Sequence, residues 1–335
     1  MIDLTTPRAL GSSEVSVSPV IFGAWAIGGW MWGGADEADS IAAIRASIDS
    51  GATTIDTAAI YGLGDSEEVV GKAIRGLRDR VQIATKCGMR WDSDEGADPW
   101  ASKDQSGRDV VIRKNSRPES VVYELEQSLK RLGTDFIDLY QVHWPDSTTP
   151  VEETMAALVK LKDQGKIRAI GVSNYDVSWM RRAQAVAPLA SLQPPYSLIQ
   201  RKIEPEILPF CRENGIGVIV YSPLERGLLA GTVGPDRVFP EGDHRATHRF
   251  FTVVNRERVL QSLKRVRPIA ERHGVSLAQV AINWTIQEPG VTAALVGART
   301  AEQARHNAEA MRFALTAEER AEVRLAFDTT SAAMM

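Results

Sequence analysis

Eight short apolar segments, each followed by an amphipathic stretch, constrain the fold of this chain more than any other feature. They are rich in Val, Ile and Leu without strict alternation, which is typical of parallel strands buried on both faces. We predict strands at Val20–Gly23, Thr54–Asp56, Val81–Thr85, Phe136–Val142, Ile167–Val172, Ser191–Gln193, Gly217–Tyr221 and Ala293–Val296. Because strand and helix alternate without an evident linker, we predict an α/β fold, one (β/α)8 TIM barrel over residues 1–335. A doubly wound open sheet is the alternative.

The predicted helices begin at side chains that can accept a hydrogen bond from a free backbone N–H group. Several of these side chains have an acid or amide three positions later, the pattern of a capping box. The residues interpreted in this way are Asp36, Asp65, Ser116, Thr149 and Ser276. In addition, Thr316 and Glu319 predict an extra C-terminal helix over Thr316–Phe327.

Three segments interrupt the alternation of strand and helix. Met89–Ser116 and Gly231–Phe251 are long and polar, and they follow the third and seventh predicted strands. In a barrel both would be βα loops at the C-terminal face, where active sites lie, and loops of this length are usually functional or disordered. Arg8–Pro19, with Gly-Ser at its turn, predicts a short N-terminal cap that closes the other end of the barrel.

Composition excludes several classes of function. The net charge is −4, with no long run of one sign, so nothing indicates binding of nucleic acid or of an anionic membrane. No segment approaches the roughly 18 apolar residues that span a bilayer, and no signal peptide is evident. The two cysteines, Cys87 and Cys211, are too few for a disulfide scaffold. We expect a cytoplasmic protein that acts on a small molecule.

Four polar residues follow predicted strands in a pattern that suggests chemistry. Asp56 ends the second strand, Lys86 follows the third and His143 follows the fourth, while Tyr61 comes five residues after Asp56. A charge at the end of a buried strand is costly unless it is paired, and Asp56 and Lys86 on neighbouring strands can pair with each other. A purely structural ion pair at the barrel rim is the alternative interpretation.

These residue types suit the reduction of a carbonyl group. A phenol has a pKa of about 10, and a nearby ammonium group lowers it. Tyr61 beside Lys86 could therefore donate a proton to a carbonyl oxygen while His143 orients the substrate. No side chain supplies hydride, so a nicotinamide or a flavin must be bound.

The motifs around these residues resemble the aldo-keto reductase superfamily. The resemblance rests on Asp56–Gly62 with Ser66-Glu67, Leu139–His143, Gly165–Arg168 through Gly171–Asn174, Tyr221–Leu224 with Gly227–Leu229, and Gly297–Arg299 with Gln303 and Asn307. It covers nearly the whole chain in order. The opening Trp25…Gly28-Gly29-Trp30 and the pair His143-Trp144 most resemble the bacterial branch of general-stress and inositol-operon reductases.

The resemblance implies a role for each matching residue. Tyr61 would be the acid/base, with Lys86, Asp56 and His143 completing a catalytic tetrad. The residues implied in cofactor binding are Ser173, Asn174 and Gln193 for the carboxamide, Tyr221 for stacking on nicotinamide, Ser222, Leu224 and Gly227 along the pyrophosphate, and Arg299, Gln303 and Asn307 near the 2′-phosphate and adenine, with Gly297 in the same motif. Gln303 could instead cap its own helix from Thr300.

The cofactor is expected to be NADP(H) in preference to NAD(H), because the guanidinium of Arg299 matches a phosphate in charge and geometry. The sequence departs from the family at His306, where an acidic residue is common. Trp25, Trp32 and Trp144 are predicted to form a wall for a small carbonyl or alcohol substrate, with core packing as the alternative. We assign no metal to His244 and His248, although they are four residues apart.

Two other functions remain open. Lys86 at a barrel strand end could form a Schiff base with a substrate, as in an aldolase. The chain could also be a regulatory barrel that binds NADP(H) and turns over little substrate, as the similar potassium-channel β subunits do. The spacing from Asp56 to Tyr61, together with Arg299, favours the reductase.

Overall fold

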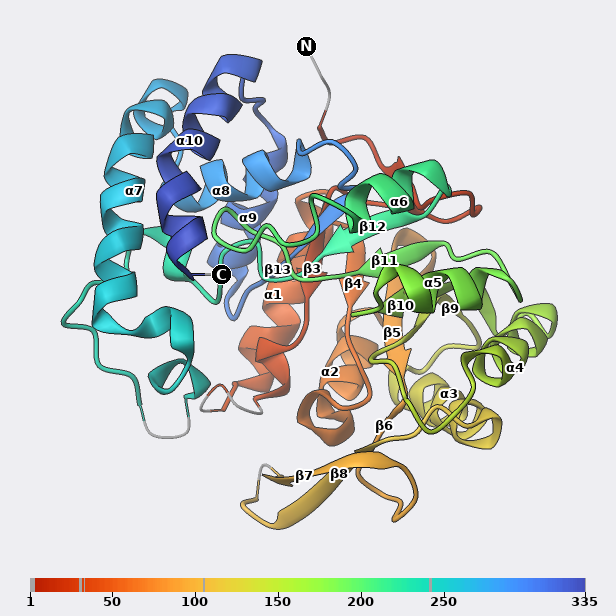
Figure 1. Cartoon of the computed structure of the whole chain (residues 1–335). Helices are drawn as coiled ribbons and strands as arrows, with labels where there is room; N and C mark the ends of the chain where they lie inside the picture. The colour runs from red at the N-terminus through yellow and green to blue at the C-terminus, as the bar shows by residue number, and fades with distance from the viewer. Residues whose placement is uncertain (1–3, 30–31, 33, 105, 241–242, 335) are drawn as a thin grey trace.

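Eight parallel strands form a closed barrel, as the sequence predicts (Figure 1). The computed structural model describes residues 4–29, 32, 34–104, 106–240 and 243–334. The barrel strands are β3 (Val20–Gly23), β4 (Thr54–Asp56), β5 (Gln82–Cys87), β9 (Ile137–Val142), β10 (Ile167–Ser173), β11 (Ser191–Gln193), β12 (Gly217–Val220) and β13 (Ala293–Gly297). Because the order closes β13 onto β3 and β9 onto β10, no open sheet edge remains in the barrel. The doubly wound sheet is therefore excluded.

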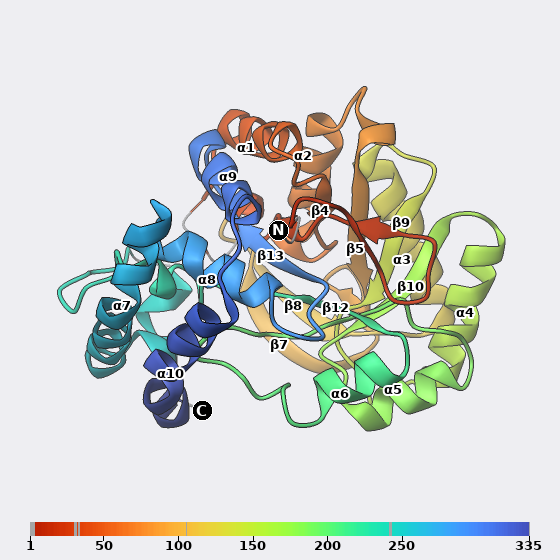
Figure 2. The same ribbon diagram turned by 90° about the horizontal axis from the view of Figure 1, so that it is seen from above.

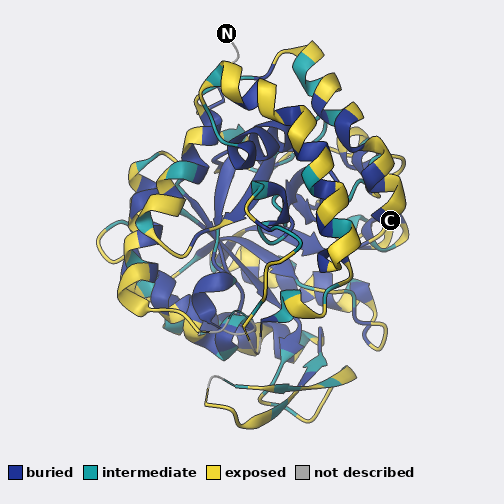
Figure 3. Cartoon of the chain, turned by 90° about the vertical axis from the view of Figure 1, so that its left-hand side faces the viewer, coloured by how far each residue is buried: buried dark blue, intermediate teal, exposed yellow. Residues whose placement is uncertain are grey.

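A ring of helices surrounds this barrel (Figure 2). Each barrel strand leads to a helix that covers its outer side: α1 (Glu37–Asp49), α2 (Asp65–Ala73), α3 (Pro118–Leu132), α4 (Val151–Asp163), α5 (Val177–Gln184), α6 (Ile207–Glu213), α8 (Leu277–Ile286) and α9 (Ala301–Ala308). The strands are buried on both faces, whereas the helices expose their outer sides (Figure 3). This explains why the strand sequences are apolar throughout.

The boundaries of β3, β4 and β11 are as predicted, and those of the other five barrel strands differ by one or two residues. The largest difference is at β5, which continues to Cys87, so that Lys86 lies inside the strand and not after it. Conversely, β12 ends at Val220, and Tyr221 begins the following loop. These shifts set the depth of the polar residues: Lys86 points into the barrel, whereas Tyr221 lies at its rim.

The predicted N-terminal cap is confirmed as a small hairpin. Strands β1 (Arg8–Ala9) and β2 (Ser16–Val17) pair antiparallel. Leu10, Val15 and Val17 pack with the side chains that fill the barrel interior, so the hairpin closes the end opposite the site. Gly11 makes the turn possible, since its φ is 58° and a Cβ there would lie 2.5 Å from a backbone oxygen of Gly215.

The segment Met89–Ser116 is not the irregular loop that its polar composition suggested. It forms a three-stranded antiparallel sheet of β6 (Met89–Arg90), β7 (Ala97–Lys103) and β8 (Asp109–Lys114) below the barrel in Figure 1. One face of this small sheet is anchored by Ile112 and Trp100, which pack with residues of the loop after β4. Its other residues are mostly exposed or only partly buried, which is why the apolar signal was weak.

The second long segment, Gly231–Phe251, does remain a loop over its described residues, with two short 3-10 turns at His244–Ala246 and Arg249–Phe251. It leads into a long helix, α7 (Val253–His273), that the sequence analysis did not separate from the barrel helices. The extra C-terminal helix is confirmed as α10 (Ala317–Met334) and is longer than predicted. The two helices pack against each other, and Ser262 and Thr330 form a 2.9 Å hydrogen bond between them.

The predicted helix caps are confirmed at three of six starts. Asp36 accepts from the backbone N–H of Asp39, Ser276 forms a capping box with Gln279, and Thr316 forms one with Glu319.

The other three predicted caps are wrong. The capping positions are Gly64, Arg117 and Pro150, where the sequence analysis placed Asp65, Ser116 and Thr149. Thr149 instead donates to Asp146 at 2.8 Å, and the Ser116 hydroxyl has no hydrogen-bond partner among the described residues. Each of these three predicted positions lies one residue from the observed cap.

Candidate active site

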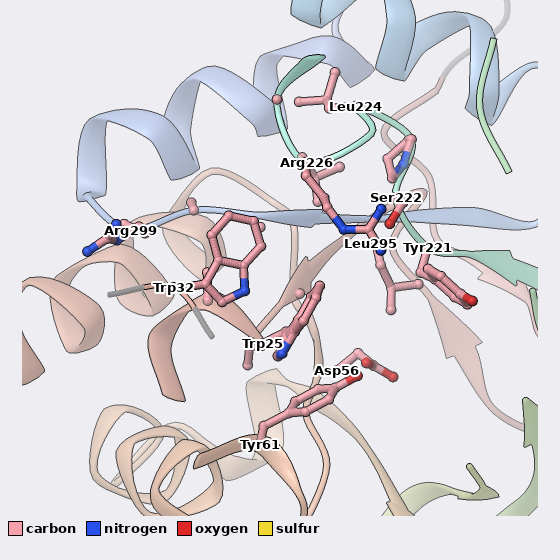
Figure 4. Close-up of a pocket in the computed structure, with 18 of the residues that line it drawn as sticks. Trp25, Trp32, Asp56, Tyr61, Tyr221, Ser222, Leu224, Arg226, Leu295 and Arg299 are labelled. Atoms are coloured by element: carbon pink, nitrogen blue, oxygen red, sulfur yellow. The ribbon is translucent and has the colours of Figure 1, made fainter. Parts of the chain in front are cut away.

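One large cavity opens at the C-terminal ends of the barrel strands. Its volume is about 1350 Å³. The tetrad residues Asp56 and Tyr61 lie at one end in Figure 4, and Arg299 lies at the other. The predicted site residues that line it are Trp25, Trp32, Asp56, Tyr61, His143, Trp144, Ser173, Asn174, Gln193, Tyr221, Ser222, Leu224, Gly227, Gly297, Arg299, Gln303 and Asn307. Only Lys86 among the predicted set is absent from the lining, because it lies beneath Tyr61.

Lys86 forms a buried ion pair with Asp56. Its Nζ donates to Asp56 Oδ1 at 2.6 Å, to the backbone oxygen of Thr57 at 2.8 Å and to Tyr61 Oη at 3.4 Å. Both residues are 1% exposed. Burial lowers the pKa of Lys86, but the charge of Asp56, the Tyr61 phenol and the hydrogen bonds outweigh it and raise the pKa above its ordinary value. Lys86 is therefore a fixed cation.

Tyr61 stands at the start of a tight turn after β4. The turn Tyr61–Gly64 contains left-handed residues at Gly62 and Leu63, so that the chain reverses directly after the phenol. Burial raises the pKa of Tyr61, the Lys86 charge lowers it, and the net shift is upward. The expected lowering of this pKa is therefore wrong: Lys86 only offsets part of the desolvation. The phenol stays protonated at neutral pH.

His143 faces the same phenol from β9. Its ring centroid lies 5.7 Å from that of Tyr61, with the two rings nearly perpendicular. Burial lowers the pKa of His143 well below its usual value, and the Lys86 charge lowers it further. The imidazole is therefore neutral and can donate one N–H bond or accept one.

A network of amides lies next to the tetrad. Asn174 donates to the backbone oxygen of His143 and to Ser173 Oγ, both at 3.0 Å. Tyr221 Oη donates to Asn174 Oδ1 at 2.9 Å. Gln193 Nε2 donates to the second carboxylate oxygen of Asp56 at 2.8 Å. The predicted carboxamide site and the tetrad are thus one connected, mostly buried group of side chains.

The far end of the cavity is built at the start of α9. Arg299 donates to the backbone oxygen of Gly34 at 2.8 Å, and its own backbone N–H donates to Gln303 Oε1 at 2.9 Å. Thr300 caps the helix by accepting from the backbone N–H of Gln303. Asn307 donates to the backbone oxygen of Gly297 at 3.1 Å. A guanidinium beside a helix N-terminus favours an anion.

Residues 19–326 match the aldo/keto reductase family. The chain belongs to the aldo/keto reductase family. It is 39% identical to aldo-keto reductase YhdN of Bacillus subtilis (strain 168), over 96% of this chain and 93% of that protein. It is 38% identical to the NADH-specific methylglyoxal reductase of Escherichia coli (strain K12), over 92% and 94%. The solved structure of a glycerol dehydrogenase of Gluconobacter oxydans is 37% identical, with a TM-score of 0.87 and coverage of 100% and 97%.

Membership of this family makes the chain an oxidoreductase that acts on carbonyl compounds. In this aldo/keto reductase the three predicted tryptophans all lie at the cavity. The imidazole of His244, from the loop after β12, packs 5.1 Å from the Trp25 ring and 4.7 Å from the Trp32 ring. Trp144 is 38% exposed and has the Lys114 ammonium 5.8 Å from its ring centroid. His244 thus belongs to an aromatic cluster over the cavity.

The sequence analysis missed four residues of the site: Gln141, Arg226, Trp100 and Lys114. Arg226 extends into the cavity in Figure 4, on a loop where Glu225 and Arg226 both have positive φ. Trp100 and Lys114 reach the cavity from the β6–β8 sheet. Gln141 lies two residues before His143, so alternation along β9 (Ile137–Val142) turns its side chain to the same side as His143, and this spacing could have identified it. Nothing in the sequence places the other three.

Two further observations concern the described part of the aldo/keto reductase chain. No group of three or more His, Cys, Asp and Glu side chains there could hold a metal ion. No helix there combines the length and the apolar character that crossing a bilayer requires.

Proposed function

We propose that this chain is an NADP(H)-dependent oxidoreductase that interconverts small aldehydes or ketones with alcohols, with Tyr61 as the proton donor. The observation that carries the proposal is the placement of the Tyr61 phenol, 3.4 Å from the buried Lys86 ammonium, at the wall of a cavity that also reaches Arg299. The cavity therefore offers a proton at one end and a cation for a phosphate at the other.

The proton chemistry follows from the charges of the four residues. Tyr61 holds its proton at neutral pH because burial raises the pKa of its phenol. The fixed cation Lys86 favours the phenolate that forms when this proton is donated, and Asp56 keeps Lys86 charged and in place. The neutral His143 can donate a hydrogen bond to the same substrate oxygen. In the oxidation direction the phenolate accepts the alcohol proton.

The cavity fits a dinucleotide. Its volume exceeds the roughly 300–1,000 Å³ of a drug-sized ligand site, and polar side chains line its full length. Gln193, Asn174 and Ser173 would hold the carboxamide, and Tyr221 would pack on the ring. Ser222, Leu224, Gly227 and Gly297 would follow the pyrophosphate. A bound nicotinamide supplies the hydride that no side chain can provide.

Arg299 supports a preference for NADP(H). It is exposed at the start of α9, beside Gln303 and Asn307, and makes no ion pair with a carboxylate among the described residues, so its charge remains available to a 2′-phosphate. The similar Escherichia coli protein is NADH-specific, which makes the preference a matter for measurement. We place the substrate between Trp25, Trp32 and Trp144, and the enzyme in the cytoplasm, where the two free, buried cysteines would stay reduced.

The test is turnover with simple aldehydes, ketones and secondary alcohols in the presence of NADPH or NADH. We expect quenching of tryptophan fluorescence on NADPH binding, substrate-dependent oxidation of NADPH, and weaker binding of NADH. Tight NADPH binding without turnover of any carbonyl or alcohol would favour the regulatory barrel instead. Equal affinity for both cofactors would contradict the role of Arg299.

A Schiff-base function of Lys86 is disfavoured by its environment. A lysine nucleophile needs a neutral amine, which an apolar pocket or a neighbouring cation produces. Here the pKa of Lys86 is raised, its Nζ is held by Asp56, and its side chain has no exposed surface. Failure of borohydride to trap a carbonyl substrate on the enzyme is the expected result, and trapping on Lys86 would overturn the reductase assignment.

A further inference from the structure

Gln141 is a buried polar side chain beside the tetrad that the proposed function does not use. It lies on β9 at the level of Lys86 on β5 and of Gly171 on β10, and it has no exposed surface. Its Nε2 donates to Asp56 Oδ2 at 3.3 Å, and its Oε1 accepts from Gln193 Nε2 at 3.3 Å. Gln141 therefore touches both the carboxylate of the tetrad and the amide of the predicted carboxamide site.

Gly171, at the same level on β10, leaves room for the Gln141 side chain. A Cβ at Gly171 would lie 3.0 Å from Gln141 Cγ and 2.4 Å from Ser191 Oγ. A side chain at position 171 would therefore force Ser191 to shift and would press on Gln141, and the glycine avoids both contacts.

The carboxylate of Asp56 determines how both amides are turned. An ionised carboxylate only accepts hydrogen bonds, so each amide must present Nε2 to it and not Oε1. Asp56 Oδ2 accepts from Gln193 at 2.8 Å and from Gln141 at 3.3 Å, while Oδ1 accepts from Lys86. With Nε2 of Gln193 shared between Asp56 and Gln141, its Oε1 is left for a ligand.

The polar side chains next to Gln193 already have hydrogen-bond partners. Asn174 Oδ1 already accepts from Tyr221, and Ser173 Oγ accepts from Asn174 while donating to the backbone oxygen of Gln193. No hydrogen bond to Gln193 Oε1 is made by the residues that the structure describes, and Gln193 lines the cavity. An N–H donor on the ligand is the complement of this oxygen.

We propose that Gln141 is a positioning residue, which bridges the Asp56 carboxylate and the Gln193 amide and holds Gln193 Oε1 toward the carboxamide N–H of a nicotinamide cofactor. The inference rests on the proposed function, since it assumes that the cavity takes this cofactor. It adds that, besides the direct bond between Gln193 and Asp56, the proton-donor group and the cofactor-amide site share a second link through a side chain that contacts neither substrate nor cofactor.

The test uses NADP+ and its 3-acetylpyridine analogue, in which a methyl group replaces the amide nitrogen and no N–H donor remains. The dissociation constant of each is measured by tryptophan fluorescence with the wild type, with Gln141→Met and with Leu139→Met. Met has a similar volume to Gln but neither donates nor accepts strong hydrogen bonds. Leu139, two residues earlier on the inner face of β9, is the control for a general disturbance of the barrel interior.

We expect the wild type to bind the analogue about tenfold more weakly than NADP+, because a buried acceptor is left unpaired. In Gln141→Met the Gln193 Nε2 keeps its bond to Asp56 but loses the bond to Gln141, so the amide can rotate about its one remaining bond and Oε1 is no longer held toward the ligand. The ratio should therefore fall to within about threefold. Leu139→Met should keep the wild-type ratio. An unchanged ratio in Gln141→Met would overturn the inference.

The wild type alone also tests the inference if Gln141→Met does not fold, since equal binding of NADP+ and the analogue by the wild type would refute the orientation of Gln193. Absence of any NADP+ binding or turnover by the wild type would instead refute the proposed function, so the two failures are distinguishable.

Discussion

The carboxylate of Asp56 and the ammonium of Lys86 lie 2.6 Å apart with no exposed surface on the lysine side chain, directly beneath the cavity. An ion pair in such a place is weak support for stability, because desolvation of the two charges cancels much of their attraction. Its value here is that it fixes a cation beside the Tyr61 phenol. Each step of the proposed chemistry depends on that charge being present across the working pH range.

Asp56→Asn should make turnover sensitive to alkaline pH. Without the Asp56 charge, burial is the largest remaining influence on Lys86, and it lowers the pKa of this group. We expect kcat of the variant to fall at a lower alkaline pH than that of the wild type. Because the lost charge leaves Lys86 uncompensated, a stability loss of about 3–5 kcal/mol should accompany it.

Asp138→Asn is the matched control for this experiment. Asp138 is 2% exposed and pairs with Arg78 at 2.7 Å, but it lies at the start of β9, far from the cavity end of the strand. Its loss should reduce stability without changing the pH dependence of kcat. The same pH profile in Asp56→Asn and the wild type would show that Lys86 does not depend on Asp56.

Arg299→Ala should separate the two cofactors. Loss of a charge-assisted hydrogen bond to a phosphate should raise the Kd of NADPH by about tenfold to a hundredfold, whereas that of NADH should change by less than about twofold. Arg305→Ala, on the exposed side of the same helix, controls for the loss of a positive charge from α9. Parallel losses for both cofactors in Arg299→Ala would contradict recognition of a 2′-phosphate.

The barrel and its rim were predictable because they follow from short-range patterns. Buried parallel strands must be apolar throughout, and the polar residue that ends each strand must then lie at one rim, which is how Asp56 and His143 were found. The β6–β8 sheet was not predictable, because few of its residues, Met89, Trp100 and Ile112 among them, anchor it and the others are exposed or only partly buried.

The electrostatics of the site could not be read from the sequence either. The sign of the Tyr61 pKa shift depends on whether burial or the Lys86 charge is larger, and burial is a property of the assembled barrel. Similarly, Arg226 reaches the cavity because its backbone adopts a positive φ of 56°. An arginine at that position does not predict this conformation.

Glu124→Gln should change how stability depends on pH. Glu124 is 3% exposed on α3 and accepts from the backbone N–H of Gly88 at 3.0 Å. Burial raises the pKa of Glu124 from 4.5 to about 7. Between pH 4.5 and about 7 the folded chain binds this proton more tightly than the unfolded chain does. The contribution of Glu124 to stability is therefore present at low pH and is lost as the pH rises toward 7.

The measurement is the free energy of unfolding of Glu124→Gln and the wild type by urea at about pH 5 and pH 8. From the lower to the higher pH, the free energy of unfolding of Glu124→Gln should rise by roughly 1–3 kcal/mol relative to that of the wild type. Glu119→Gln, an exposed residue on the same helix, controls for the removal of a carboxyl from α3. A pH-independent difference between Glu124→Gln and the wild type would show that Glu124 does not titrate in this range.

The most direct test of Tyr61 as the proton donor is the single-turnover rate of carbonyl reduction by Tyr61→Phe with NADPH. The phenol is the only group at the cavity that is both protonated at neutral pH and held by Lys86, so its loss should lower the rate by about 10²–10⁴-fold. The Kd of NADPH should stay within about twofold of the wild-type value, and Tyr123→Phe, an exposed tyrosine on α3, should leave both quantities unchanged. A rate close to that of the wild type in Tyr61→Phe would contradict the role of Tyr61 as proton donor.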